Sequence, residues 1–340
     1  MSDSVLSMSI GDAAGLHPGV ADFFITAGVA ENERTVTVAD WLARWNDGRT
    51  GDLGMDSAQA GAHLLARVAR AASPEPAVRV DSLTITGGVD KGGNACGLTV
   101  TVRAGDVVCV VGPTGSGKSR LLADIECLAQ GDTPSGRRVL VNGTAPGEAL
   151  RCASSGKLIA QLSQNMNFVM DLTVGNFVAL HADCRIADAA RRDAAVGAVI
   201  ACANDLAGER FSPATSLTQL SGGQSRALMI ADTALLSASP IVLIDEIENA
   251  GIDRRKALDL LVSKDKIVLM STHDPILALL GSRRLVIRNG AVAGMIDTSR
   301  RERDTLRRLE ALDRGMMDLR GRLRAGSRID APLDWLTDAL

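Results

Sequence analysis

The chain has 340 residues, a length that suits one large domain with appended segments better than one small domain. Its formal net charge of −3 favours neither nucleic acid nor a membrane as a partner, and no apolar run reaches the roughly 18 residues that a membrane span needs. The start of the chain lacks a basic region followed by an apolar stretch, so we expect no secretory signal. The cysteines are scattered without a CxxC pair, and we interpret them as thiols of a reducing cytosol: Cys96, Cys109, Cys127, Cys152, Cys184 and Cys202.

Residues 1–77 contain short apolar stretches that predict a small helical domain. Thr37 followed by Asp40 is typical of a helix start, close to a capping box. Trp41, Leu42 and Trp45 then fall on one helical face. The sequence ASPEPA at 72–77 predicts a linker or turn after this domain.

Residues 78–298 alternate strand-like runs with helical patterns, which indicates α/β architecture. The predicted core strands are VVCVVG at 107–112, VLVNG at 139–143, IVLIDE at 241–246 and KIVLMST at 266–272. We find no internal repeat and no low-complexity tract.

A glycine-rich loop follows the first of these strands and precedes a helical pattern. Its residues have the spacing of a P-loop, which cradles phosphates with backbone N–H groups and the start of a helix. The predicted nucleotide-binding residues are Gly112, Pro113, Thr114, Gly115, Ser116, Gly117, Lys118, Ser119 and Arg120. We expect Lys118 to reach the β- and γ-phosphates and the Ser119 hydroxyl to bind Mg²⁺.

Two further polar motifs follow in chain order. The sequence LSGGQ (Leu220, Ser221, Gly222, Gly223, Gln224) precedes the helical run SRALMIADTALL and predicts a second anion-binding loop. The strand IVLIDE ends in adjacent carboxylates. We expect Asp245 to help hold Mg²⁺ and Glu246 to align or activate the attacking water.

Residues 299–340 are strongly charged and predict an amphipathic C-terminal helix. Apolar residues recur every three or four positions, and the opposite face is rich in arginine: Leu306, Leu309, Leu312, Met316, Leu319 and Leu323 form the apolar stripe. We expect the stripe to pack against the body or a partner chain, in preference to nucleic acid.

The combination of four motifs resembles that of the ATP-binding cassette (ABC) ATPases: GPTGSGKS, LSGGQ, IVLIDE and a later STHD. The resemblance covers about residues 78–298 and implies a P-loop cassette with a mixed β core and a helical subdomain that carries LSGGQ. The helical N-terminal domain would precede this cassette and the C-terminal helix would follow it.

The resemblance also implies roles for matching residues. Gln164 resembles the glutamine that senses Mg²⁺, His273 the switch histidine at the γ-phosphate, and Asp253 the D-loop aspartate that crosses to the other subunit. In this family two cassettes sandwich two ATP molecules, and Ser221 and Gly223 would contact the γ-phosphate held by the other cassette. A chain with one cassette therefore implies a homodimer or a paired homologue.

The sequence departs from the family pattern at several points. No Phe, Trp or Tyr lies between residues 78 and 111, where an aromatic ring usually stacks on adenine. Arg120 replaces a hydroxyl residue, and Ile247 and Glu248 follow the acidic pair where a proline is usual. The segment from Glu246 to Asp253 is one position longer than is typical.

Three functions are compatible with these motifs. The first is the ATPase subunit of a membrane transporter with a separately encoded permease, placed in the cytoplasm at the inner membrane face. The second is an ABC ATPase that remodels or activates a protein complex, favoured by the helical extension before the cassette. The third is a DNA-repair-type ATPase, because IDEIEN at 244–249 is similar to chromosome-maintenance ATPases, but the absence of a long coiled coil within the cassette argues against it.

Overall fold

The structure of the chain is a computed structural model that describes residues 5–16, 18–45, 54–72, 79–151, 157–163, 168, 170–186, 188–246 and 252–330. The chain divides into two compact units, Met1–Val78 and Arg79–Leu340, and each unit has a hydrophobic core of its own. The division falls beside the segment in which the sequence predicts a linker.

The first unit is built from short helices around an aromatic core. Its helices are α2 (Ile10–Gly15), α3 (Pro18–Thr26), η1 (Glu31–Glu33), α4 (Val38–Ala43) and α6 (Ser57–Ala72). The predicted start of α4 is confirmed, because the Thr37 hydroxyl accepts a hydrogen bond from the backbone N–H of Asp40 at 3.1 Å. Trp41 is buried and packs edge-to-face on Phe24 and Trp45, with ring centroids 5.6 and 5.2 Å away.

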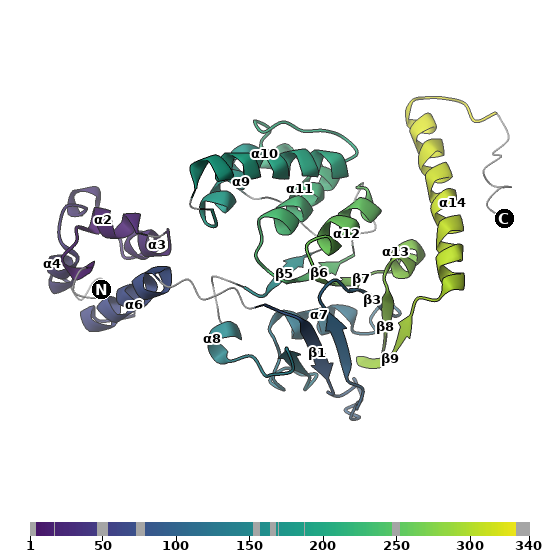
Figure 1. Cartoon of the computed structure of the whole chain (residues 1–340), viewed down its shortest axis with the longest axis horizontal. Coiled ribbons are helices and arrows are strands. Elements are labelled where there is room, and N and C mark those ends of the chain that lie inside the picture. Colours follow the sequence, from purple (N-terminus) through teal and green to yellow (C-terminus); the bar gives the residue numbers. More distant parts are fainter. Residues whose placement is uncertain are drawn as a thin grey trace. The chain divides into compact units, whose positions relative to one another are not determined.

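The second unit is centred on a six-stranded sheet in the order β5-β6-β7-β3-β8-β9, shown in Figure 1. The strands are β3 (Val107–Val111), β5 (Ile159–Leu162), β6 (Ile241–Asp245), β7 (Ile267–Ser271), β8 (Arg283–Arg288) and β9 (Ala291–Asp297). All neighbours pair in parallel except β8 and β9. The continuous apolar runs of β3, β6 and β7 are buried on both faces, as parallel strands covered by other layers require.

A second, three-stranded antiparallel sheet lies against the first. Its strands are β1 (Ser82–Thr86), β2 (Val100–Arg103) and β4 (Arg138–Val141), in the order β2-β1-β4. The predicted core strand at 139–143 is present as β4, which pairs with β1 in this sheet and contributes Val139 and Val141 to the core. Helix α7 (Lys118–Glu126) buries Leu121, Leu122 and Ile125 in a core shared with both sheets.

Helices cover the other face of the parallel sheet. They are α11 (Gly222–Leu235), α12 (Arg254–Val262) and α13 (Pro275–Leu280). Helices α9 (Val174–Asp183) and α10 (Ala189–Leu206) pack with α11, and α8 (Glu148–Arg151) and the turn η2 (Leu217–Gln219) lie elsewhere in the unit. Residues of α11, α12 and α13 share a core with β3, β6 and β7. Helices α9, α10 and α11 form a further core with Phe177 and Phe211.

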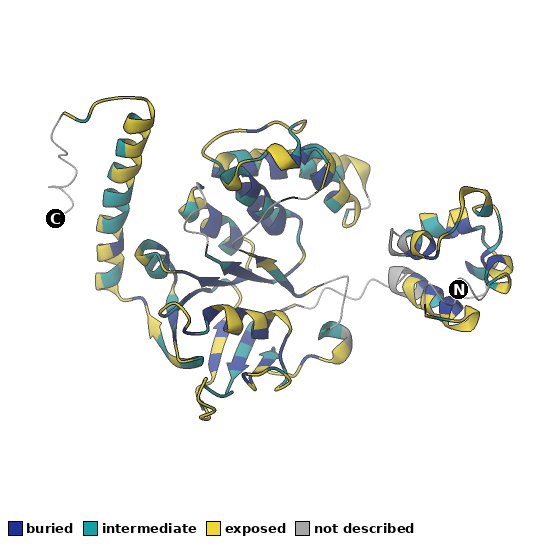
Figure 2. Ribbon diagram, turned by 180° about the vertical axis from the view of Figure 1, so that it is seen from behind, coloured by how far each residue is buried: buried dark blue, intermediate teal, exposed yellow. Residues whose placement is uncertain are grey.

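The predicted C-terminal helix is present as α14 (Arg300–Arg324), with a capping box between Ser299 and Glu302. Its apolar stripe is not buried along its length, because only Leu306 of the helix is buried, whereas Met316 and Leu323 are 42% and 56% exposed. Figure 2 shows the strands of the sheet largely in dark blue and α14 largely in yellow and teal. The expected packing against the body therefore holds only for the first part of the helix.

No helix within the described residues combines the length and the apolar character needed to cross a bilayer.

Candidate nucleotide site

The predicted P-loop connects β3 to α7 and is folded tightly at its glycines. A Cβ atom at Gly112 would lie 2.4 Å from the carbonyl oxygen of Ile287, so only glycine fits there. Gly117 caps α7 in the left-handed region, with φ of +105°. The loop therefore turns directly into the start of α7, where the free N–H groups and the helix dipole favour an anion.

The outer side of the P-loop is braced by two segments that the sequence analysis did not single out. Gly290, in the β8–β9 turn, donates its N–H to the carbonyl of Ser116 at 2.7 Å. The Lys91 ammonium group donates to the carbonyl of Gly115 at 2.6 Å, and the Lys91 N–H donates to Asn289. The sequence Asn289-Gly290 is a strong hairpin signal and could have located this turn, although not its contact with the loop.

The loop that carries Lys91 is itself held by an ionised carboxylate. Asp90 accepts hydrogen bonds from the side chain and backbone of Asn94 and from the backbone of Gly92. The hydrogen bonds from Asn94 lower the pKa of Asp90, since they stabilise its charged form. Asn289 donates to the same carboxylate, so this loop and the β8–β9 turn are connected.

Lys118 lies at the centre of the site and is almost fully buried. Its ammonium group donates to the carbonyl oxygens of Gly112 at 3.0 Å and Pro113 at 3.3 Å. The same nitrogen lies 3.0 Å from Nε2 of His273, which follows β7. The structure thus brings the predicted phosphate-binding lysine and the predicted switch histidine together.

The two predicted acids stand at the end of β6, next to the end of β7. Glu246 has a left-handed backbone with φ of +50°, a strained conformation for a side chain of this size. Its N–H donates to the carbonyl of Ser271 at 3.1 Å, and its Oε1 lies 3.7 Å from Nε2 of His273. The left-handed backbone of Glu246 thus accompanies a side chain whose carboxylate lies close to the histidine.

The oxygen atoms at this edge of the sheet fit a magnesium ion. Oδ1 of Asp245 and Oγ of Ser271 are buried without a hydrogen-bond partner, although buried polar atoms are normally paired. Among the described residues no group of three His, Cys, Asp or Glu side chains could hold a metal ion. Gln164, the third predicted magnesium ligand beside Asp245 and Ser119, lies outside the described residues.

The LSGGQ motif forms the start of α11. Ser221 and Gln224 make a complete capping box: the Ser221 hydroxyl accepts from the Gln224 N–H at 3.3 Å, and Oε1 of Gln224 accepts from the Ser221 N–H at 2.8 Å. Ser221 and Gly222 are exposed, and Leu220 and Gly223 are half-buried. The motif thus presents the start of a 14-residue helix at the surface.

Two other predicted site residues use their side chains within the chain. Asp253 caps α12, since its carboxylate accepts from the Lys256 N–H at 3.1 Å. The Arg120 guanidinium lies along α7, 3.5 Å from the carboxylate of Asp124. Residues 247–251, which include Glu248, lie outside the described residues.

Comparison with known proteins identifies the family. The model of the ABC transporter family matches residues 96–249. An uncharacterised ABC transporter ATP-binding protein of Methanocaldococcus jannaschii is 50% identical to the chain over 253 residues, which is 74% of this chain and 96% of that protein. The chain belongs to the ABC family. Because ATP hydrolysis is the activity of this family, the site is that of an ABC-type ATPase.

Further ABC proteins match the same part of the chain less closely. The thiamine import ATP-binding protein ThiQ of a Chelativorans species is 32% identical over 211 residues, 59% of this chain and 80% of that protein. Among solved structures, CbiO1 of Clostridium perfringens, part of an ABC transporter complex, has a TM-score of 0.53 at 18% identity. It covers 68% of this chain, and 95% of CbiO1 is matched. This structural likeness shows the ABC cassette fold.

Proposed function

We propose that the chain hydrolyses MgATP in a head-to-tail pair of cassettes and uses the cycle to do conformational work on a partner. The observation that carries this proposal is the convergence of Lys118, His273 and Glu246 at neighbouring strand ends. A cation, a switch side chain and a carboxylate base in this arrangement fit phosphoryl transfer, which depends on positioning and charge stabilisation.

In this proposal each side chain has one task. Lys118 binds the β- and γ-phosphates, and His273 contacts the γ-phosphate. Glu246 orients a water molecule and accepts its proton as the water oxygen bonds to the γ-phosphorus. The bond from the γ-phosphorus to the bridging oxygen breaks, which releases ADP and phosphate. Ser119, Asp245 and Gln164 would hold Mg²⁺, which when bound neutralises charge on the phosphate oxygens.

The second half of each site would come from another cassette, most simply a second copy of this chain. The start of α11, where Ser221 is exposed and Gly223 is half-buried, supports this because it offers N–H groups and a helix dipole to an anion from outside the chain. A homodimer with two-fold symmetry would place two such motifs over two P-loops.

The partner that receives the work is proposed to be a transmembrane permease. This rests on the names of the relatives, which include a thiamine import ATP-binding protein and an ABC transporter ATP-binding protein. Remodelling of a protein complex is the second candidate, favoured by the helical unit that ends at Val78, ahead of the cassette.

Replacement of Glu246 tests the ATPase proposal. We expect Glu246→Gln to abolish turnover while an ATP-bound dimer accumulates, because the amide cannot accept the proton. Size-exclusion chromatography with and without ATP measures the dimer, and phosphate release measures turnover. Glu148→Gln, on the surface helix α8, is the control and should hydrolyse ATP normally. Wild-type hydrolysis by Glu246→Gln would remove this residue from the proposed role.

Purification of partners tests the transporter proposal separately. A tagged chain is recovered from detergent extract and from soluble lysate, and co-purifying proteins are identified. A multi-span protein in the detergent extract supports a permease. Recovery of soluble proteins alone would exclude the transporter and leave the remodelling function.

A further inference from the structure

Arg254, the first residue of α12, connects helices that carry different parts of the site. Its guanidinium donates one hydrogen bond to Asp274, at the start of α13, and another to Asp313 of α14 at 3.0 Å. The side chains are shielded from water, with exposed fractions of 15% for Arg254, 17% for Asp274 and 33% for Asp313. Such partly buried, charge-assisted contacts are stronger than exposed ion pairs.

Asp274 is the residue directly after His273, and both of its oxygens are used. Oδ1 caps α13 by accepting from the N–H of Ile276 at 2.7 Å, while Oδ2 accepts from Arg254. Its own N–H donates to the Thr272 hydroxyl at 3.0 Å, on the other side of the histidine. A shift of Asp274 would therefore move the backbone that carries His273.

Arg254 also follows Asp253 directly, at the positive end of the α12 dipole. A cation in this position is unfavourable for the helix. The two acids that surround Arg254 offset this cost, and neither belongs to α12. The stability of α12 alone therefore does not account for an arginine here. Its contacts account for it, because they connect the segment of His273 and Asp274, and also α14, to α12.

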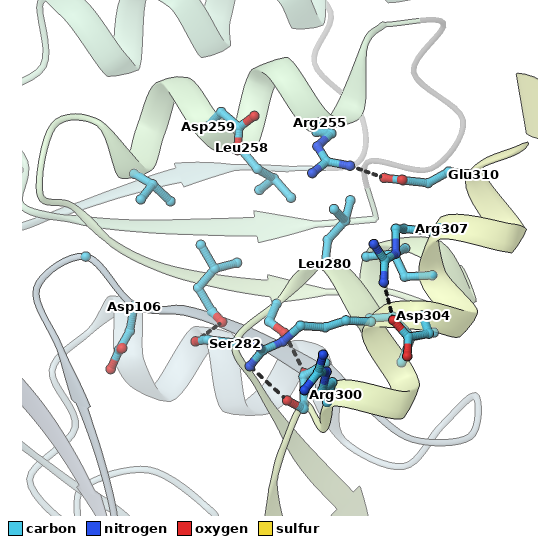
Figure 3. A pocket seen from close by; sticks show the side chains of 18 residues that line it. Asp106, Arg255, Leu258, Asp259, Leu280, Ser282, Arg300, Asp304, Arg307 and Glu310 are labelled. Atoms are coloured by element: carbon cyan, nitrogen blue, oxygen red, sulfur yellow. Dashed lines mark hydrogen bonds and ion pairs between the residues drawn. The ribbon is translucent and has the colours of Figure 1, made fainter.

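Charged groups connect α12 to α14 at two places. A cavity of about 670 Å³ lies between α12, α13 and the first part of α14 (Figure 3). Arg255 reaches Glu310 of α14 at 2.6 Å at the edge of this cavity. Arg254 and Arg255 thus make parallel connections to α14, but only Arg254 also holds Asp274.

We propose that Arg254 is a positioning residue for ATP hydrolysis. It fixes Asp274, and through it His273, against the helix that follows the D-loop, and α14 supports it through Asp313. This inference rests on the proposed role of His273 in hydrolysis. It also makes α14 part of the support of the ATPase site, so a partner that displaces α14 would alter turnover.

Kinetics of matched variants test the inference. We expect Arg254→Ala to lower kcat about tenfold or more and to leave the KM for ATP within about twofold, because a misplaced group costs rate more than ground-state binding. Asp313→Asn removes the charge on α14 but keeps the contact between Arg254 and Asp274, so it should lower kcat less. Arg254→Lys should recover part of the rate. Arg255→Ala removes the parallel connection to α14 and should leave kcat unchanged.

Nuclear magnetic resonance of the histidine rings tests whether Arg254 positions His273, because a role of Arg254 in global stability alone would leave the His273 signal unchanged. The chain has four histidines, so His273→Ala assigns the signal of His273. We expect Arg254→Ala to shift or broaden that signal, while Arg255→Ala does not. An unchanged His273 signal, or equal losses of kcat in Arg254→Ala and Arg255→Ala, would overturn the inference. Full hydrolysis by His273→Ala would instead refute the proposed role of the histidine. In that case the shift of the His273 signal in Arg254→Ala would still show that Arg254 positions the ring.

Discussion

The ammonium nitrogen of Lys118 lies 3.0 Å from Nε2 of His273, although the two residues are 155 positions apart in the chain. The reason is that β3 and β7 are parallel neighbours, so the segments after both strands leave the sheet at the same edge. Ligand sites of open α/β sheets occur at this edge. Strand order therefore brings the segments that carry the two groups proposed to bind the terminal phosphates to the same edge of the sheet.

Lys118→Ala should weaken ATP binding itself. The variant loses a charge-assisted contact with the phosphates that is worth about 1.5–3 kcal/mol, which corresponds to about a 10- to 160-fold rise in Kd. Isothermal titration calorimetry with ATP measures this change. Lys264→Ala, which removes an exposed lysine, serves as the control. If Lys118→Ala binds ATP as the wild type does, the assignment of the P-loop is wrong.

Arg137→Ala should destabilise the fold strongly. Arg137 and Asp124 form an ion pair at 2.7 Å with side chains only 2% and 1% exposed, and Asp124 also accepts from the Ser135 hydroxyl. Removing one partner leaves the other charge buried, which costs about 3–5 kcal/mol of unfolding free energy. Chemical denaturation measures the loss. The control Arg79→Ala breaks an exposed pair with Asp81 and should change stability by less than about 1 kcal/mol.

The sequence predicted the core strands and the P-loop because both are encoded locally. The runs 107–111, 241–245 and 267–271 are apolar throughout, a pattern that buried parallel strands produce without reference to a partner. Strand β4 was predicted as well, but its place in the antiparallel sheet was not, because pairing of Leu83 with Val141 is a long-range relationship that the apolar pattern does not specify.

The parts of the site that the sequence did not predict depend on contacts between distant residues. Lys91 braces the P-loop through the carbonyl of Gly115, and Arg254 reaches acids on two other helices. Charged residues at such positions resemble ordinary solvent-exposed groups in the sequence. The periodicity of α14 likewise predicted a helix with an apolar stripe, but periodicity does not tell which part of the stripe is covered.

Gly290→Ala should weaken both the fold and ATP binding. Gly290 has φ of +84°, and a Cβ atom there would lie 3.1 Å from Cγ and 3.3 Å from the backbone nitrogen of Lys91. Backbone strain of this kind costs about 1–2 kcal/mol. Since the N–H of Gly290 supports Ser116, we also expect a higher Kd for ATP.

Denaturation and calorimetry measure the two effects of Gly290→Ala. Gly294→Ala, in β9, is the matched control because no atom lies within 4 Å of its Cβ position and its φ is not positive. Equal stability and affinity in the two variants would show that the β8–β9 turn does not support the P-loop.

The pH dependence of stability should carry a contribution from Lys266. Its ammonium group is buried and donates to the carbonyl oxygens of Ser237 and Ser239 at 2.9 and 2.8 Å. Burial, with smaller contributions from the charges of Arg185 and Lys264, lowers the pKa of Lys266 from 10.5 to about 8. Between these values the unfolded chain keeps a proton that the folded chain has released, so stability rises with pH in this range.

Comparison with Lys266→Met isolates this contribution from all other titrating groups. The free energy of unfolding of the wild type, minus that of Lys266→Met, should be constant below about pH 8 and rise by on the order of 3 kcal/mol by about pH 10.5. Urea denaturation at a series of pH values measures the difference. A difference that stays flat across this range would show that the folded protein holds the Lys266 proton as tightly as the unfolded chain does. The burial of its ammonium group would then be fully offset by the two carbonyl contacts.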